Sequence, residues 1–252
     1  MPEVSIIIPA YNEQKRLPGT IKKLQKLLDR SKFSAEVIIV VEKSSDKTLA
    51  LAQKSAKTDS RFYVHDNKVH KGKGYAVKTG ILQARGRYIF FMDADFSTDG
   101  SAIGKFINYF KSHPDVSVLI GSRAHHASNI VVSQNLLRRT MGKAFNLFIR
   151  LLVFQGIKDT QCGFKAFKKN AAQKIFRAQT IDGFAFDVEV LLIARKLGYK
   201  IAILPVTWKN SADSKVELFS GSAKMLKDLI YIKRRSLKAD FTSGLDTAQI
   251  LD

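Results

Sequence analysis

Two patterns of apolar residues alternate along the first half of the chain. Short, almost continuous apolar runs predict strands buried on both faces of a sheet, at residues 4–8, 36–41, 61–65, 88–92 and 116–120. Between them, apolar residues three or four positions apart predict amphipathic helices at residues 17–28, 47–57, 71–84 and 101–112. This alternation predicts an α/β fold with a central, mostly parallel sheet covered by helices on both faces.

The second half of the chain continues with helical patterns and two further strands. Helices are predicted at residues 136–154, 184–197 and 223–238, a strand at 200–208, and a polar turn that enters a strand at 159–165. No repeat or linker divides the chain, so residues 1–235 are predicted to form one domain. Residues 236–252 are predicted to be a poorly ordered polar tail.

Polar and charged residues follow the carboxyl ends of the first four predicted strands. In open α/β sheets, ligands bind beyond these ends. The segments should therefore line one crevice, to which they contribute Tyr11, Glu13, Glu42, Lys71, Lys73, Asp93 and Asp95. Such a set suits a nucleotide together with its metal ion. The glycines around Lys73 resemble a phosphate loop only loosely, and a flexible turn explains them equally well.

Asp93 and Asp95 come directly after the buried strand at residues 88–92. Because side chains alternate along a strand, both carboxylates should point to the same side. Two ionised carboxylates that close repel each other unless a cation lies beside them. Mg²⁺ or Mn²⁺ suits them, since such ions take few protein carboxylates and add water and substrate phosphates. The alternative role is helix capping, which residues 97–99 could supply as well.

The composition adds one anomaly, a formal net charge of +20. It indicates an anionic partner, which could be a phosphorylated substrate, nucleic acid or a lipid surface, unless it only keeps the protein soluble. The basic amphipathic segments 136–154 and 223–238 could lie on a membrane or pack on the core. No apolar run reaches the roughly 18 residues of a membrane span. The single cysteine, Cys162, suits a reducing cytoplasm and is expected to be a small buried side chain.

Six short motifs stand in order along the chain: PAYNE at residues 9–13, GKG at 72–74, DAD at 93–95, DTQCGFK at 159–165, FDVE at 186–189 and SK at 214–215. Together they resemble glycosyltransferase family 2, enzymes of the GT-A fold. Within that family they are most similar to the polyprenyl-phosphate branch, the dolichyl-phosphate glucose and mannose synthases. Each motif is weak alone, but their order and spacing over residues 4–235 are specific. The motif at 159–165 resembles the glucose synthases more than the mannose synthases.

The resemblance implies an inverting, metal-dependent transfer of a hexose from a nucleoside-diphosphate sugar to a polyprenyl or dolichyl phosphate. UDP-glucose is the first expected donor and GDP-mannose the next. Because the acceptor is a lipid, we expect the protein to bind peripherally at the cytoplasmic face of an anionic membrane. A small membrane subunit is the alternative means of attachment.

The resemblance also implies roles for individual residues. Those implied to bind the nucleotide sugar are Pro9, Tyr11, Glu13, Glu42, Lys73 and Asp93. Those implied in catalysis are Asp93, Asp95 and Lys215, with Asp95 and Asp93 as ligands of Mg²⁺ or Mn²⁺. Those implied to hold the acceptor phosphate are Arg123, Arg138 and Arg139. A phosphate acceptor is already anionic, so positioning and charge stabilisation would suffice without a strong base.

One segment departs from the family pattern. Members usually carry Asp-Asp-Gly-Ser after the second strand, where a carboxylate contacts the base or ribose, whereas residues 41–46 here read Val-Glu-Lys-Ser-Ser-Asp. Glu42 would take that place, and the identity of the base stays open. A catalytically silent binding protein is one competing interpretation, against which the retained Asp93 and Asp95 argue. A nucleic-acid-binding protein is the other, but no nucleic-acid motif supports it.

Overall fold

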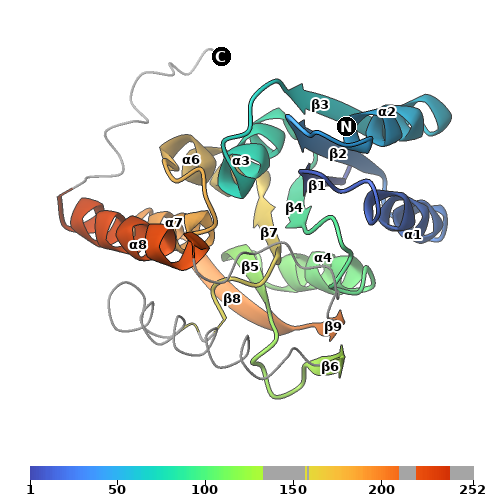
Figure 1. Ribbon diagram of the computed structural model, residues 1–252. Helices are drawn as coiled ribbons and strands as arrows, with labels where there is room; N and C mark the ends of the chain where they lie inside the picture. Colours follow the sequence, from blue (N-terminus) through green and yellow to red (C-terminus); the bar gives the residue numbers. More distant parts are fainter. Residues whose placement is uncertain (133–156, 158, 210–219, 239–252) are drawn as a thin grey trace, which may run out of the picture.

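A seven-stranded sheet runs through the part of the chain that this computed structural model describes, residues 1–132, 157, 159–209 and 220–238 (Figure 1). Its strands, in spatial order, are β3 (Phe62–Asn67), β2 (Ala35–Glu42), β1 (Val4–Ala10), β4 (Tyr88–Met92), β7 (Phe164–Lys168), β5 (Val116–Ser122) and β8 (Lys200–Pro205). All neighbours are parallel except β7, which is antiparallel to both β4 and β5. The predicted α/β fold with a mostly parallel sheet is confirmed.

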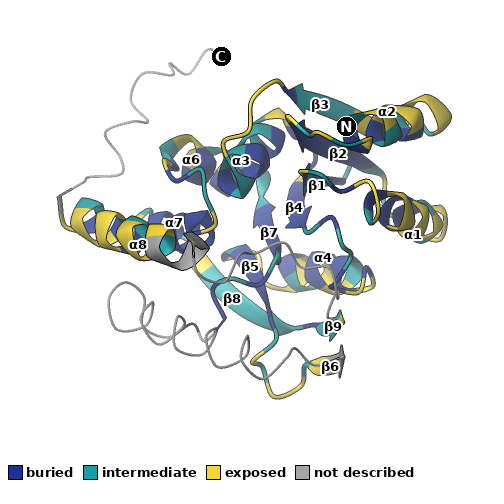
Figure 2. Cartoon of the chain, in the orientation of Figure 1, coloured by how far each residue is buried: buried dark blue, intermediate teal, exposed yellow. Residues whose placement is uncertain are grey.

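Helices cover both faces of this sheet (Figure 1). One layer contains α1 (Leu17–Asp29), α2 (Thr48–Thr58) and α4 (Ala102–Ser112). The other contains α3 (Lys73–Gln83), α6 (Lys169–Ala178) and α7 (Phe186–Lys196), with α8 (Ser220–Lys238) packed on α7. Side chains of β1 alternate between the layers, so that Ile6 and Ile8 join the first core and Ile7 the second. Figure 2 shows the buried sheet between the exposed outer sides of the helices.

The structure differs from the predicted elements in its last strand region. The single strand predicted at residues 200–208 is two strands, because β8 ends at Pro205, which has no N–H to continue the ladder. β9 (Thr207–Lys209) pairs instead with β6 (Asn129–Val132) in a separate two-stranded sheet. Neither β6 nor α6 (Lys169–Ala178) is among the predicted elements, and the helix predicted at 136–154 lies outside the described residues.

The fold places the carboxyl ends of β1, β2, β3 and β4 side by side along one edge of the sheet. The other predicted helices are present with ends shifted by a few residues, and α8 continues through Lys238. The domain boundary at residue 235 stays a prediction. Within the described ranges, no helix combines the length and the apolar character that crossing a bilayer requires.

Candidate active site

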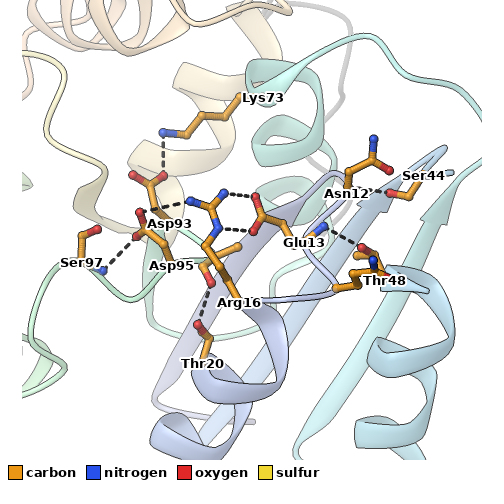
Figure 3. A network of polar contacts seen from close by, with 12 residues as sticks. Asn12, Glu13, Arg16, Thr20, Ser44, Thr48, Lys73, Asp93, Asp95 and Ser97 are labelled. Carbon is orange, nitrogen blue, oxygen red and sulfur yellow. Dashed lines mark hydrogen bonds and ion pairs between the residues drawn. The ribbon is translucent and has the colours of Figure 1, made fainter. Parts of the chain in front are cut away.

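Asp93 and Asp95 directly follow β4 and lie at the carboxyl edge of the sheet (Figure 3). Nζ of Lys73 is 2.6 Å from Oδ1 of Asp93. Oδ1 of Asp95 accepts a hydrogen bond from the backbone N–H of Ser97 at 2.9 Å, and its Oδ2 is 3.9 Å from NH1 of Arg16. The exposed fractions of the two side chains, 37% for Asp93 and 17% for Asp95, leave both carboxylates accessible to a ligand.

The two carboxylates suit a divalent metal that takes its remaining ligands from a substrate. Among the residues that the structure describes, no group of three or more His, Cys, Asp or Glu side chains could hold a metal. Mg²⁺ and Mn²⁺ do not need such a group, because they bind through one or two carboxylates plus phosphates and water. Neither carboxylate caps α4, whose N-cap is Ser101, and the N–H of Ser101 donates to Oδ1 of Asp99 at 2.7 Å. Asp93 and Asp95 are therefore available for a metal.

Lys73 enters this site because α3 begins at the crevice. Gly72 before it has a φ of 125°, and a Cβ there would lie 2.7 Å from a carbonyl oxygen of a neighbouring loop, so this position requires glycine. Burial opposes the charge of Lys73, but Asp93 and Asp187 outweigh it and raise the pKa of Lys73 above its usual value. A permanent positive charge thus lies beside the two carboxylates.

Glu13 contacts Arg16, a residue that sequence reasoning missed. Nε of Arg16 donates to Oε2 of Glu13 at 2.6 Å, and a second contact joins NH2 to Oε1 (Figure 3). The N–H of Glu13 donates to Oγ1 of Thr48 at 2.7 Å, which ties the loop after β1 to α2. Glu13 therefore orients Arg16 toward Asp95. Pro9, the other nearby residue predicted to bind the nucleotide, lies within β1.

Tyr11, Glu42 and His70 meet at the carboxyl ends of β1, β2 and β3, where Glu42 is the last residue of β2. The rings of Tyr11 and His70 are stacked, with centroids 3.8 Å apart and planes inclined by 8°. Oε2 of Glu42 is 2.7 Å from Nδ1 of His70, and Oε1 accepts the N–H groups of Lys71 and Gly72 at 3.0 and 2.9 Å. The structure thus gathers the predicted Tyr11 and Glu42, and it adds His70, which sequence reasoning missed.

The loop before β7 lies directly against Asp93. A Cβ added at Gly163 would be 1.9 Å from Oδ2 of Asp93, so this contact requires glycine. Beneath the loop, Nζ of the buried Lys165 donates to the carbonyl oxygen of Cys162 at 2.8 Å and pairs with Asp187. Burial raises the pKa of Asp187, and Lys165 opposes that shift. Burial also raises the pKa of the Cys162 thiol to about 12, so Cys162 is the small buried side chain that was expected.

Glu189, the last residue of the FDVE motif, supports the protein structure away from the two carboxylates. Its carboxylate is buried and accepts the backbone N–H groups of Thr180 and Ile181, at 3.0 and 2.8 Å. NH1 of Arg235 in α8 is 2.7 Å from its Oε1. Glu189 therefore fixes the loop before α7 and attaches α8 to it.

Arg123, predicted to hold the acceptor phosphate, is engaged with Asp159. Nε donates to Oδ2 at 2.9 Å and NH2 to Oδ1 at 2.7 Å. Burial opposes the charge of Asp159, but the bonds from Arg123 outweigh it and lower the pKa of that carboxyl. The pair joins the end of β5 to the loop before β7. Lys215, Arg138 and Arg139 lie outside the described residues.

The fold and the paired carboxylates define a GT-A-type glycosyltransferase, and the sequence assigns the family. The model of "Glycosyl transferase family 2" matches residues 5–176, so the chain belongs to that family and is a glycosyltransferase. Its relatives include the dolichyl-phosphate beta-glucosyltransferase of Dictyostelium discoideum, 38% identical, with 93% of this chain and 75% of that protein covered. The enzyme of the same name from Homo sapiens is 33% identical, with 93% and 76% covered. The predicted family and branch are confirmed.

Solved structures support the fold. Glucosyl-3-phosphoglycerate synthase from Mycobacterium tuberculosis, in complex with Mg²⁺ and UDP, superposes with a TM-score of 0.69 at 15% identity, covering 92% of this chain and 80% of that one. Mannosyl-3-phosphoglycerate synthase from Rubrobacter xylanophilus gives a TM-score of 0.63 at 17% identity, with 99% and 77% covered. At such low identity, these similarities concern the fold alone.

Proposed function

We propose that this enzyme transfers glucose from UDP-glucose to dolichyl phosphate or a similar polyprenyl phosphate, with a divalent metal and inversion at the anomeric carbon. The observation that carries the proposal is the pair of accessible carboxylates, Asp93 and Asp95, beside the half-buried cation of Lys73. They lie at the sheet edge where open α/β folds bind nucleotides. The names of the relatives supply the sugar and the acceptor, and a structural neighbour bound to UDP and Mg²⁺ supports the donor class.

In this reaction, a phosphate oxygen of the acceptor attacks the anomeric carbon, and the bond from that carbon to the UDP oxygen breaks. UDP leaves with the electron pair of that bond. A phosphate monoester is already anionic near neutral pH, so the protein needs no strong base. Bound Mg²⁺ or Mn²⁺, held by Asp95 and Asp93, would neutralise charge on the leaving diphosphate. Lys73 and Lys215 would add positive charge at the same place.

The acceptor phosphate is assigned to Arg138 and Arg139, together with Arg123. The guanidinium fork suits phosphate because it donates two parallel hydrogen bonds. Since Nε and NH2 of Arg123 are engaged with Asp159, Arg123 contributes chiefly positive charge at this position. Direct contacts are therefore assigned first to Arg138 and Arg139.

A transfer assay tests the proposal. The purified chain, labelled UDP-glucose, dolichyl phosphate and Mn²⁺ should yield a labelled lipid, and EDTA should stop its formation. Alanine at Arg138 and Arg139 should raise KM for dolichyl phosphate and leave UDP-glucose affinity unchanged. Absence of any transfer would overturn the proposal. Transfer from GDP-mannose in place of UDP-glucose would keep the reaction class and overturn the donor.

The lipid acceptor must be reached at a bilayer, and α8 offers a surface for peripheral binding. Its large exposed apolar side chains are Leu226, Ile230, Tyr231 and Leu237. Its exposed cations are Lys224, Lys227, Lys233 and Arg234. The opposite side of the helix packs inward through Leu229 and Ile232. An exposed face that mixes apolar and basic residues suits the interface of an anionic membrane. The free thiol of Cys162 suits its cytoplasmic side.

Liposome sedimentation tests this attachment. The chain should sediment with anionic vesicles and not with neutral ones, and salt should weaken the binding. Gln at Lys227, Lys233 and Arg234 should reduce sedimentation, while Gln at Lys22, Lys54 and Lys57, which removes equal charge from α1 and α2, should not. Arg235 is left unchanged because it is paired with Glu189. Absence of binding to either vesicle would favour a membrane subunit.

A further inference from the structure

Glu42, the last residue of β2, has both of its carboxylate oxygens engaged in hydrogen bonds. The side chain of Glu42 is only 2% exposed. Its Oε1 accepts two backbone N–H groups of the loop before α3, and its Oε2 contacts Nδ1 of His70 at 2.7 Å. A base in the crevice therefore cannot reach Glu42 without dismantling this loop. The side chain of His70, by contrast, is 45% exposed.

Glu42 determines which nitrogen of His70 carries the proton. An ionised carboxylate can only accept hydrogen bonds, so Nδ1 of His70 must be the donor. In the neutral ring, Nε2 is then an acceptor with an available lone pair. Within the described chain, Nε2 has no hydrogen-bond partner. The stacked ring of Tyr11, 3.8 Å away, fixes the plane of the imidazole.

The position of His70 corresponds to the nucleoside end of the crevice. His70 lies beyond β3 and β2, whereas Asp93 follows β4, on the other side of β1. The residues from His70 to Lys73 connect the two places, because Nζ of Lys73 contacts Asp93. A nucleotide with its diphosphate at Asp93 would extend its base toward His70 and Tyr11.

We propose that His70 recognises the base of the nucleotide sugar. Its Nε2 accepts a hydrogen bond from the N3–H of uracil, while Glu42 keeps the proton of the imidazole on Nδ1. This inference rests on the proposed function, since it names the base of the same donor. Uracil presents an N–H at this position, whereas cytosine presents a bare nitrogen there and has nearly the same size. UDP and CDP therefore differ only along this edge of the base, at N3 and at the neighbouring O4 or NH₂ group.

Calorimetry with UDP and CDP, each with Mn²⁺, tests the assignment. The unmodified chain should bind UDP about tenfold more tightly than CDP, the effect of one hydrogen bond. His70→Phe keeps a ring to stack on Tyr11 but removes the acceptor, so the two affinities should become nearly equal. His65→Phe is the matched control, since His65 is a histidine of β3 whose Nδ1 contacts Gln83 at the far end of α3. It should keep the tenfold preference.

Glu42→Gln supplies a second test, whose expected result a purely structural role of His70 could not explain. The amide oxygen of Gln can still accept the loop N–H groups, while its NH₂ donates to Nδ1 of His70. The proton then moves to Nε2, which becomes a donor. The preference should therefore invert in favour of CDP.

Equal binding of UDP and CDP by the unmodified chain would overturn the role of His70 and leave the proposed function standing. So would a preference that survives in His70→Phe. Binding of neither nucleotide by the folded chain would instead overturn the proposed function.

Discussion

The two ends of the central sheet use the same kinds of charged residue for different purposes. At the amino end, Glu36 at the start of β2 is 3% exposed. It accepts hydrogen bonds from Oγ of Ser5 at 2.6 Å and from N and Nε of Arg85 at 2.7 and 2.8 Å. At the carboxyl end, Asp93 and Asp95 are more exposed, and each faces one cation. A carboxylate with a closed set of donors stabilises the fold, whereas one with open positions can take a ligand.

This difference predicts where substitutions affect stability and where they affect turnover. Removing one partner of a buried, fully bonded charge leaves other polar groups unpaired, which destabilises the folded state. An accessible carboxylate near other charges contributes little to folding, because solvent screens its ion pairs. The comparison can be tested at both ends with single substitutions.

Asp95→Ala should have the largest effect. Loss of a metal ligand should lower the rate of transfer by about 1,000-fold or more, since a metal contributes several kcal/mol of charge stabilisation. The melting temperature should hardly change. Asp99→Ala, which removes a nearby exposed aspartate just before α4, is the control and should keep its turnover. Near-normal transfer by Asp95→Ala that still depends on metal would show that Asp95 is not a metal ligand.

Gly163→Ala should have the next largest effect. The added Cβ would lie 1.9 Å from Oδ2 of Asp93, so the carboxylate must move away from its place beside Lys73. A displacement of about 1 Å in such a site can reduce turnover by about 100-fold. Kinetics with a parallel thermal melt would separate this effect from unfolding. An unchanged kcat would show that the position of Asp93 is not critical.

Sequence patterns predicted most of the fold because each parallel strand and its following helix form a local unit. They did not give the direction of β7, since an apolar run shows that a segment is a strand but not which neighbours it joins. They also missed α6, although its buried residues Ala171, Ala172, Ile175 and Phe176 have the spacing of one helix face. Pro205 could have marked the break between β8 and β9.

The candidate site was predicted to the extent that it follows from topology. Residues at the carboxyl ends of neighbouring parallel strands lie at the same edge of a sheet. This rule correctly predicted that Tyr11, Glu42 and Asp93 share one edge. What it could not supply were the partners, because His70 and Glu42 are 28 residues apart and meet only through the pairing of β2 with β3. The same holds for Gly163, whose contact with Asp93 depends on β7 lying beside β4.

At the amino end, Glu36→Gln should reduce stability by about 2 kcal/mol at pH 7 and leave kcat unchanged. Burial opposes ionisation of Glu36, but the bonds from Ser5 and Arg85 outweigh it and lower its pKa below the usual 4.5. The stability that this carboxylate contributes is therefore present above pH 4.5 and is lost as pH falls through the lowered pKa. Urea unfolding at pH 7 and below pH 4 should show the two proteins converging in acid. A difference in the free energy of unfolding that is the same at both pH values would show that it does not arise from the ionised carboxylate of Glu36.

Gly104→Ala should have the smallest effect and the opposite sign. Gly104 lies within α4, and a Cβ there would meet nothing within 4 Å. Alanine loses less backbone entropy than glycine in a helix, so the variant should gain about 0.5 kcal/mol of stability with unchanged turnover. Because the substitution is the same as at Gly163, the pair separates a glycine that only lowers helix stability from one that the site requires. Urea unfolding and transfer kinetics on both variants make the comparison. If Gly104→Ala lost turnover as Gly163→Ala is expected to do, the effect at Gly163 could no longer be assigned to its contact with Asp93.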